Sequence, residues 1–327
     1  MFYKLVLLLQ LTGQAVCYQH LRSRTGDVVR VFREFEDQFD RGYRRGKGGR
    51  RGEEIERFRI FRKHYVEVAR HNAEHVHPDY FLELNKFSDL ADRELQGYLG
   101  LKGNVTEELE QLERGQVQGA ELEDEEEEED LVKRGRVPAD VDHQAAGIVT
   151  PIKNQGLCGA CWGFASVDAF ESAYKQATGY LKSFSVQEIL DCYYEGQPGV
   201  DGCDGGKHYE PFIYVASGGR LATYNSYRYT GRDGPCTSLP ENGIKNARLA
   251  TFRVVKGKDK ARALEKAAVK RVLAVTLHAS TMFYYRSGVF NSCPTYFPAY
   301  PDHAMVLTGF TQQYWLVLLK FNGYFLI

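Results

Sequence analysis

The residues with the clearest capacity for chemistry are two cysteines three positions apart, Cys158 and Cys161, followed directly by Trp162. An apolar run from Phe164 to Phe170 follows at helical spacing, so the pattern predicts that Cys161 opens a buried helix. Unpaired N–H groups and the positive dipole end of such a helix stabilise a thiolate, which is the nucleophilic form of cysteine. The stretch therefore predicts a nucleophilic cysteine at position 161.

Two other chemistries use the same Cys-x-x-Cys spacing. A redox pair is expected in a thioredoxin-like βαβ context, and half of a zinc site needs a second Cys/His pair at regular spacing. Neither context is evident in the sequence. The nucleophile is favoured over both, and we expect no cofactor and no metal.

Two sets of motifs resemble a known family. Cys-Gly-Ala-Cys-Trp at 158–162 resembles the signature of the papain-like cysteine proteases. Upstream, six residues fall on the spacing of the ERFNIN motif in that family's propeptides, although His64 replaces the usual Asn and Val68 the usual Ile. These six are Glu53, Arg57, Phe61, His64, Val68 and Asn72. Residues 85–89 resemble the family's GNFD motif, with Glu83 where Gly is usual.

The resemblance, which is to the cathepsin L type, implies an α+β fold. Its peptidase domain is a papain-like two-lobed fold, with a helical left lobe and an antiparallel β-barrel-like right lobe, preceded by an α-helical inhibitory propeptide. The spacing of apolar residues itself predicts an amphipathic helix over 53–72, strands near 253–255 and 272–277, and a helix capped by Ser185. In the family the propeptide's tail crosses the active-site cleft backwards.

The N-terminus has the composition of a secretory signal. Lys4 precedes an apolar core from Leu5 to Leu11, and small residues at Ala15 and Cys17 suit cleavage before Tyr18. We therefore expect a signal peptide over 1–17, a propeptide with an acidic linker over 18–136, and a shortened peptidase domain over 137–327. The expected location is extracellular or lysosomal, where disulfides persist.

Charge is distributed unevenly along the chain. Residues 1–136 carry 23 basic and 28 acidic side chains and residues 137–327 carry 19 and 15, so an acidic leader precedes a basic body. The basic, glycine-rich stretch over 41–51 is interpreted as a solvated linker between helices rather than a nucleic-acid patch. Residues 104–136, with the acidic run 121–130, are predicted to be unfolded. They include a glycosylation sequon at Asn104 and basic cleavage sites at 133–136.

A thiolate protease needs an imidazole that acts first as base and then as acid. His303 is preferred because it follows Cys161 by 142 residues, within the separation of about 130–150 residues typical of this family. His143, His208 and His278 are the alternatives.

The resemblance also implies roles for residues around the two catalytic groups. Gln155 would stabilise the oxyanion together with the backbone N–H of Cys161. The implied substrate-binding residues are Gly159, Trp162, Gly205, Gly206 and Asp302. The implied disulfides are Cys158–Cys203 and Cys192–Cys236, which leaves Cys293 without an assigned partner.

The C-terminal part departs from the family. Relatives continue after a Tyr-Trp strand with roughly Lys-Asn-Ser-Trp-Gly, and this Asn orients the imidazole. Here Tyr314-Trp315-Leu316-Val317 leads into Leu318 and Leu319, and about ten residues that include the Asn are missing; Asn322 aligns better with a later position.

Two functions follow from these observations. The main one is a cysteine endopeptidase zymogen, monomeric, which acts on polypeptides and is inhibited by its own propeptide and by cystatin-like proteins, without binding nucleic acid or membrane. The alternative is a catalytically impaired relative that binds peptides or protease inhibitors.

Overall fold

The computed structural model describes residues 25–43, 51–74, 79–102, 120–122, 138–193, 202–216, 221–237, 252–255, 260–292, 301–319 and 323–326. The predicted signal peptide, the sequon at Asn104, the cleavage sites at 133–136, Cys293 and Asn322 lie outside these residues. The described chain forms two compact units. One ends at Asp92 and also includes Tyr284–Arg286, and the other contains the remaining residues from Arg93 onward.

The first unit is built on two helices, α2 (Thr25–Gln38) and α3 (Arg51–Glu74). Aromatic side chains at three- and four-residue spacing form its core, because that spacing puts them on one face of each helix. Phe32, Phe35 and Phe61 are buried, and the rings of Phe35 and Phe61 are 4.8 Å apart. The helix predicted over 53–72 is confirmed, with one added turn.

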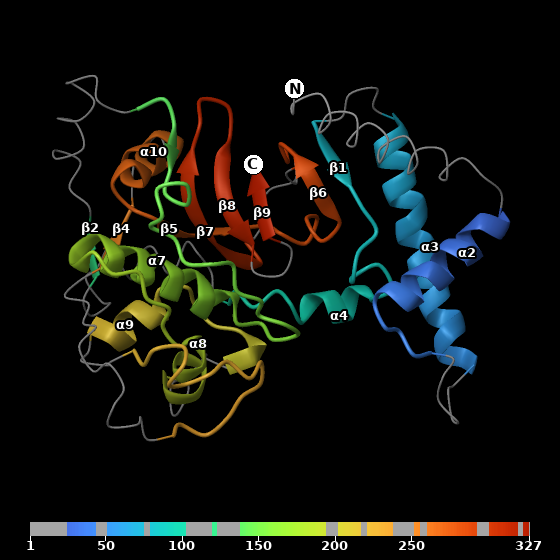
Figure 1. Ribbon diagram of the computed structural model, residues 1–327, viewed down its shortest axis with the longest axis horizontal. Coiled ribbons are helices and arrows are strands. Elements are labelled where there is room, and N and C mark those ends of the chain that lie inside the picture. The colour runs from blue at the N-terminus through green and yellow to red at the C-terminus, as the bar shows by residue number, and fades with distance from the viewer. Residues whose placement is uncertain are drawn as a thin grey trace, which may run out of the picture. The chain divides into compact units, whose positions relative to one another are not determined.

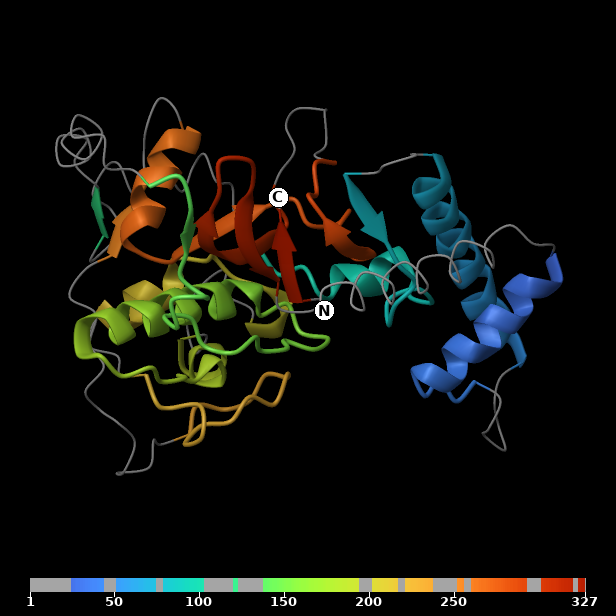
Figure 2. The same ribbon diagram turned by 45° about the horizontal axis from the view of Figure 1, so that its top comes forward.

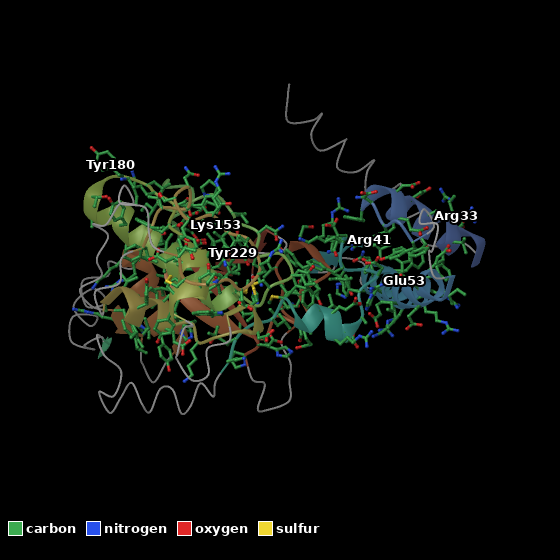
Figure 3. The ribbon with its side chains drawn as sticks, turned by 90° about the horizontal axis from the view of Figure 1, so that it is seen from below. Arg33, Arg41, Glu53, Lys153, Tyr180 and Tyr229 are labelled. Carbon is green, nitrogen blue, oxygen red and sulfur yellow. A yellow bond between two sulfur atoms is a disulfide. The ribbon has the colours of Figure 1, made fainter. Side chains whose placement is uncertain are left out.

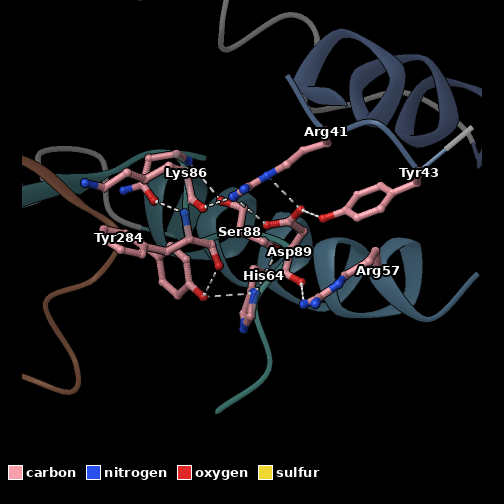
Figure 4. Close-up of polar contacts among 10 residues, drawn as sticks. Arg41, Tyr43, Arg57, His64, Lys86, Ser88, Asp89 and Tyr284 are labelled. Atoms are coloured by element: carbon pink, nitrogen blue, oxygen red, sulfur yellow. Dashed lines mark hydrogen bonds and ion pairs between the residues drawn. The ribbon is translucent and has the colours of Figure 1, made fainter. Parts of the chain in front are cut away.

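The expectation of a solvated linker between these helices is wrong for the part that the structure describes. Arg41 donates to the backbone carbonyl of Lys86 at 2.5 Å, and its Nε lies 3.1 Å from the Asp89 carboxylate. The Tyr43 hydroxyl donates to the same carboxylate (Figure 4). Arg57 donates to the backbone carbonyl of Asp89 at 3.0 Å. The buried Asp89 of the GNFD-like segment recruits these groups because a buried carboxylate must be paired.

Strand β1 (Tyr80–Leu82) pairs with β6 (Tyr285–Gly288) in a two-stranded sheet. Asn72 of α3 holds β1 through both amide atoms, accepting from Leu82 N at 3.0 Å and donating to Leu82 O at 2.8 Å. The His64 ring lies against Tyr284, with Nδ1 2.9 Å from the tyrosine hydroxyl and 3.0 Å from the Ser88 carbonyl. The His and Asn of the ERFNIN-like motif therefore connect α3 to its strand and turn.

The helical half of the second unit contains one long helix, α7 (Cys161–Thr178), followed by shorter helical turns (Figure 1). Helix α7 is buried over its first twelve residues and ends at Gly179, whose φ of 78° suits glycine. Ser185 accepts a hydrogen bond from the Glu188 N–H at 3.0 Å, which confirms the predicted cap. The helix α8 that it caps is short (Val186–Glu188), and a π-helical turn (Ile189–Tyr193), a 3-10 turn (Gly202–Asp204) and α9 (Glu210–Ala216) follow.

An antiparallel sheet forms the other half of this unit. It contains β3 (Val141–Asp142), β5 (Leu273–Leu277), β7 (His303–Phe310), β8 (Trp315–Leu319) and β9 (Gly323–Leu326). Strand β7 is central in this sheet (Figure 2). Strand β8 pairs with one edge of β7, while β5 and β3 pair with different parts of its other edge. All eight residues of β7 are buried, which explains its continuous apolar sequence. The predicted strand over 272–277 is confirmed as β5.

Helices flank this sheet. Helix α7 contacts β5 and β7, and α10 (Lys260–Lys270) also contacts β7. The helical part followed by the antiparallel sheet confirms the α+β class. Among the described residues, no helix combines the length and the apolar content that a membrane crossing requires.

One element contradicts the prediction that residues 104–136 are unfolded. Ala120–Leu122 form strand β2, which pairs in parallel with β4 (Phe252–Val254). The acidic composition alone disfavours structure, but an available strand edge supplies backbone partners that composition does not reveal. The predicted strand at 253–255 is confirmed, one residue earlier, as β4.

Candidate active site

Helix geometry places the Cys161 thiol at the first turn of α7. The preceding Ala160 offers no side-chain cap, so the first N–H groups of the helix stay available to a negative charge. A disulfide joins Cys158 to Cys203, and the Gly159 N–H donates to the Cys203 carbonyl at 2.6 Å. A second disulfide joins Cys192 to Cys236. The first bridge fixes the loop that leads into Cys161.

The sheet brings His303 to the same place. His303 is the first residue of β7 and pairs in register with Leu277 of β5. The backbone of its neighbour Ala304 hydrogen-bonds the Cys161 thiol, and Cys161 and Ala304 pack in one buried cluster. The helix from one half of the unit thus meets the strand from the other at Cys161 and Ala304, the residue after His303.

Gln155 lies in the loop before α7 with its amide directed at two carbonyls. Its Nε2 donates to Cys158 O at 2.8 Å and to Tyr98 O at 2.9 Å. The backbone carbonyl of Gln155 accepts from the Tyr229 hydroxyl at 2.7 Å (Tyr229 is labelled in Figure 3). The amide therefore already serves as a donor to a carbonyl oxygen, which is the function that an oxyanion site requires.

Residues Tyr98–Lys102, the covering segment, occupy the site. This segment follows α4 (Asp92–Gln96), and the backbone of Gly100 hydrogen-bonds the Cys161 thiol. Gly206 N donates to Gly100 O at 2.9 Å, Lys102 N donates to Gly206 O at 3.0 Å, and the bridge between Leu101 and Gly206 is parallel. Leu101 N donates to the Asp302 carbonyl at 3.3 Å. An extended peptide is thus bound by main-chain pairing at the predicted substrate residues.

Close packing explains two glycines in this arrangement. A Cβ atom on Gly100 would lie 1.7 Å from the Gly159 carbonyl oxygen, and one on Gly206 would lie 2.7 Å from the Trp162 ring. The Trp162 indole is fixed in turn, because its Nε1 donates to Gly202 O at 3.2 Å. Glycine at both positions lets the covering segment lie directly on the protein backbone.

Burial keeps both predicted catalytic groups neutral. It raises the pKa of the Cys161 thiol to about 11, despite hydrogen bonds from the backbones of Ala304, Gly100 and Trp162 that oppose the shift. It lowers the pKa of His303 to about 3. Both side chains are fully buried, so near neutral pH the site holds a thiol and an uncharged imidazole instead of an ion pair.

The alternative histidines have other contacts. His278 lies 3.2 Å from the Asp302 carboxylate and 2.6 Å from the Ser280 hydroxyl. His143 Nε2 lies 2.7 Å from the Ala268 carbonyl of α10. Burial lowers the pKa of His208 to about 4. None of the three hydrogen-bonds Cys161 among the contacts of the described residues, whereas His303 directly precedes Ala304, whose backbone hydrogen-bonds that thiol.

Sequence reasoning missed a buried ion-pair cluster on the helix that begins at Cys161. Lys153, labelled in Figure 3, lies 2.6 Å from Asp168 and 2.5 Å from Glu171, both on the buried side of α7. Thr150 also donates to Glu171. Two acidic residues inside an apolar helical run were the available signal, because buried carboxylates require partners. Tyr98 and Gly100 had no comparable signal.

The C-terminal departure from the family pattern has a structural counterpart. Leu318 of β8 is fully buried in the cluster that contains Cys161, Ala304 and Val306. Leu319 ends β8 opposite Gly323 of β9. Strand β8 thus pairs with β9 close to the point where the sequence departs from the family pattern.

Comparison with known proteins agrees with this geometry. Residues 137–321 match the family described as "Papain family cysteine protease", and residues 32–95 match the "Cathepsin propeptide inhibitor domain (I29)". The chain is 33% identical over 273 residues to the KDEL-tailed cysteine endopeptidase CEP2 of Arabidopsis thaliana, covering 81% of this chain and 70% of the relative. It is also 33% identical to germination-specific cysteine protease 1 of the same plant, with 80% and 67% covered. Digestive procathepsin L2 from Tenebrio molitor has a similar structure, with a TM-score of 0.74, 28% identity, and 92% and 94% of the two chains covered.

Proposed function

Because the chain belongs to the papain family of cysteine proteases and carries that family's inhibitory propeptide domain, we propose that it is an endopeptidase zymogen in which Cys161 is the nucleophile and His303 the general base and acid. The observation that carries the proposal is the covering segment, an extended peptide paired with Gly206 and Asp302 over the Cys161 thiol. A site that binds one extended peptide by its backbone is suited to bind others.

The proposed reaction starts when the covering segment leaves. Water then reaches Cys161 and His303, the burial penalty on charge falls, and a proton passes from the thiol to the imidazole. The thiolate sulfur attacks the scissile carbonyl carbon, and a C–S bond forms while the carbonyl electrons move to oxygen. Gln155 Nε2 and the Cys161 N–H donate to that oxyanion.

The intermediate collapses as the C–N bond breaks and the imidazolium gives its proton to the leaving amine. Water then hydrolyses the thioester with His303 as base, which frees the acid and restores the thiol. Without the family's Asn, the backbone of His303 is positioned by the pairing of β7 with β5, opposite Leu277.

We extend the proposal to the organisation of the chain. It comprises a signal peptide over 1–17, a propeptide over 18–136 and a peptidase domain over 137–327, in an extracellular or lysosomal compartment. The two disulfides in the second unit fit an oxidising compartment. The mature form would be a monomer, and cystatin-like proteins would bind where the covering segment lies.

An active-site-directed epoxide tests the proposal. After processing, the wild-type protein should be labelled on Cys161, Cys161→Ala should not react, and Cys293→Ala should react as the wild type does. Labelling without peptide hydrolysis would instead favour the impaired peptide-binding relative. Equal labelling of wild type and Cys161→Ala would refute the assignment of the nucleophile.

A further inference from the structure

Strand β4 (Phe252–Val254) is firmly attached to the helical part of the second unit. Phe252 is buried, and its ring stacks on Phe212 of α9 with centroids 5.5 Å apart. Tyr209 and Ile213 complete the same cluster. The position of this strand is thus fixed by packing that involves only the peptidase part of the chain.

The strand partner of β4 comes from the propeptide linker. Within the described residues β4 pairs with β2 alone, and Ala120, Glu121 and Leu122 are in register with Phe252, Arg253 and Val254. Arg253 is exposed, and the register sets the acidic residue 121 opposite it. A strand edge with no other described partner is a ready template for an added strand.

We propose that the edge of β4 is a second propeptide-binding site, separate from the active site, whose ligand is the extended acidic linker around Ala120–Leu122. The propeptide then binds the peptidase part of the second unit at two places, through the covering segment at Cys161 and through β2 at β4. The inference builds on the propeptide's inhibitory role and does not depend on the catalytic assignments.

Two linked contacts strengthen each other. Seventeen residues, 103–119, join the covering segment to β2. Binding at one place keeps the other contact at a local concentration in the millimolar range that short tethers provide. A cut at the predicted sites in 133–136 lies beyond β2, so the released propeptide retains both contacts. The β4 edge therefore slows the loss of the inhibitor after the chain is cut.

Amide hydrogen exchange on the full-length Cys161→Ala protein tests the pairing without any catalysis. The amides of 252–254 should be protected in this background. Successive N–H groups of a strand point to opposite sides, so proline at only one of the two positions, Glu121→Pro or Leu122→Pro, removes a donor facing β4. The other variant is its matched control. Protection should fall by about fivefold or more in one variant, the effect of one net backbone hydrogen bond.

The same proteins, cut within 133–136 by a protease whose recognition site is placed there, provide a second measurement, because trypsin would also cut after Arg114, between the two contacts. The propeptide should dissociate at least about fivefold faster from the proline variant that lacks the hydrogen bond to β4 than from its control, since one net backbone hydrogen bond is lost. Unchanged exchange in α7 serves as the check on folding. Unprotected amides at 252–254 in the background protein, or equal protection and release in both proline variants, would overturn the proposal and leave the Cys161 chemistry untouched.

Discussion

The two compact units bury polar groups in different ways. In the first unit, Asp89 is fully buried but accepts from Arg41 and Tyr43, so its charge is balanced where it lies. In the second, Cys161 and His303 are also fully buried, and burial moves both pKa values in the directions that keep these groups uncharged. The first arrangement stabilises one conformation. The arrangement in the second unit depends on the covering segment, which excludes water; once water enters, the two groups can ionise.

Breaking the balanced cluster should have the largest effect. Asp89→Ala removes the acceptor of Arg41 and Tyr43, and loss of one partner of a buried charged pair typically costs about 3–4 kcal/mol. Denaturant unfolding should show this loss in a transition assigned to α2 and α3. Asp89→Asn keeps the shape and should lose less. An unchanged midpoint for Asp89→Ala would contradict the central role of this carboxylate.

The covering segment should respond next most strongly. In Gly100→Ala, the new methyl group would meet the Gly159 carbonyl at 1.7 Å, and such overpacking costs about 2–3 kcal/mol. The unprocessed chain should then react with a thiol reagent at Cys161 some 30–100-fold faster. Gly97→Ala is the matched control, because its added carbon would meet the flexible Leu157 side chain at 3.2 Å and the Glu94 carbonyl at 3.3 Å. Equal rates for the two variants would contradict the closeness of this contact.

Acid should open the second unit through His303. Its folded pKa lies near 3 and its ordinary value is about 6.5, so the closed form disfavours the proton that the open form accepts. Closure keeps its full stability well above pH 6.5 and loses about 2 kcal/mol by pH 5. Protection factors of the Gly100 and Leu101 amides in Cys161→Ala should fall accordingly. The fall should vanish in His303→Gln and persist in His278→Gln; a fall of the same size in all three would implicate other groups.

Protonation of the acidic linker should also make the propeptide easier to release at low pH. The leader carries a net negative charge and the peptidase part a net positive charge, so protonation of carboxylates weakens their attraction. Processing should be faster at pH 4 than at pH 7, and equal rates would count against both electrostatic contributions.

The smallest effect is expected at the histidine of the ERFNIN-like motif. His64→Asn restores the residue usual in the family but loses the ring contact with Tyr284, whose centroid is 4.7 Å away. We expect the first unit to lose about 1 kcal/mol of stability, measured by thermal unfolding. His71→Asn, which alters another ring on α3, provides the comparison.

Sequence reasoning worked where one local pattern determined the structure. The helix after Cys161, the amphipathic helix over 53–72 and the Ser185 cap depend on neighbours in sequence, and the structure has all three. The pairing of β2 with β4 joins residues about 130 positions apart, and the contacts of Arg41 with Asp89 span 48. Composition described both segments as solvated because it contains no information on distant partners.

The site was predictable to a similar degree. Motif and separation predicted Cys161, Gln155 and His303, and these assignments stay predictions; the structure places Ala304, next to His303, against the Cys161 thiol. Tyr98 and Gly100 were missed because their role comes from backbone shape: an unremarkable Tyr-Leu-Gly sequence becomes informative only when Gly206 lies beside it.

The pairing of β1 with β6 affects what happens when the linker is cut. Residues Tyr284–Arg286 follow the linker in sequence yet lie in the unit formed by the N-terminal helices. A chain cut within 133–136 would migrate as one particle until the β1–β6 pairing, the covering segment and the β2–β4 pairing have all been released. Gel filtration in native buffer would then report a single peak from a sample that denaturing electrophoresis resolves into two bands.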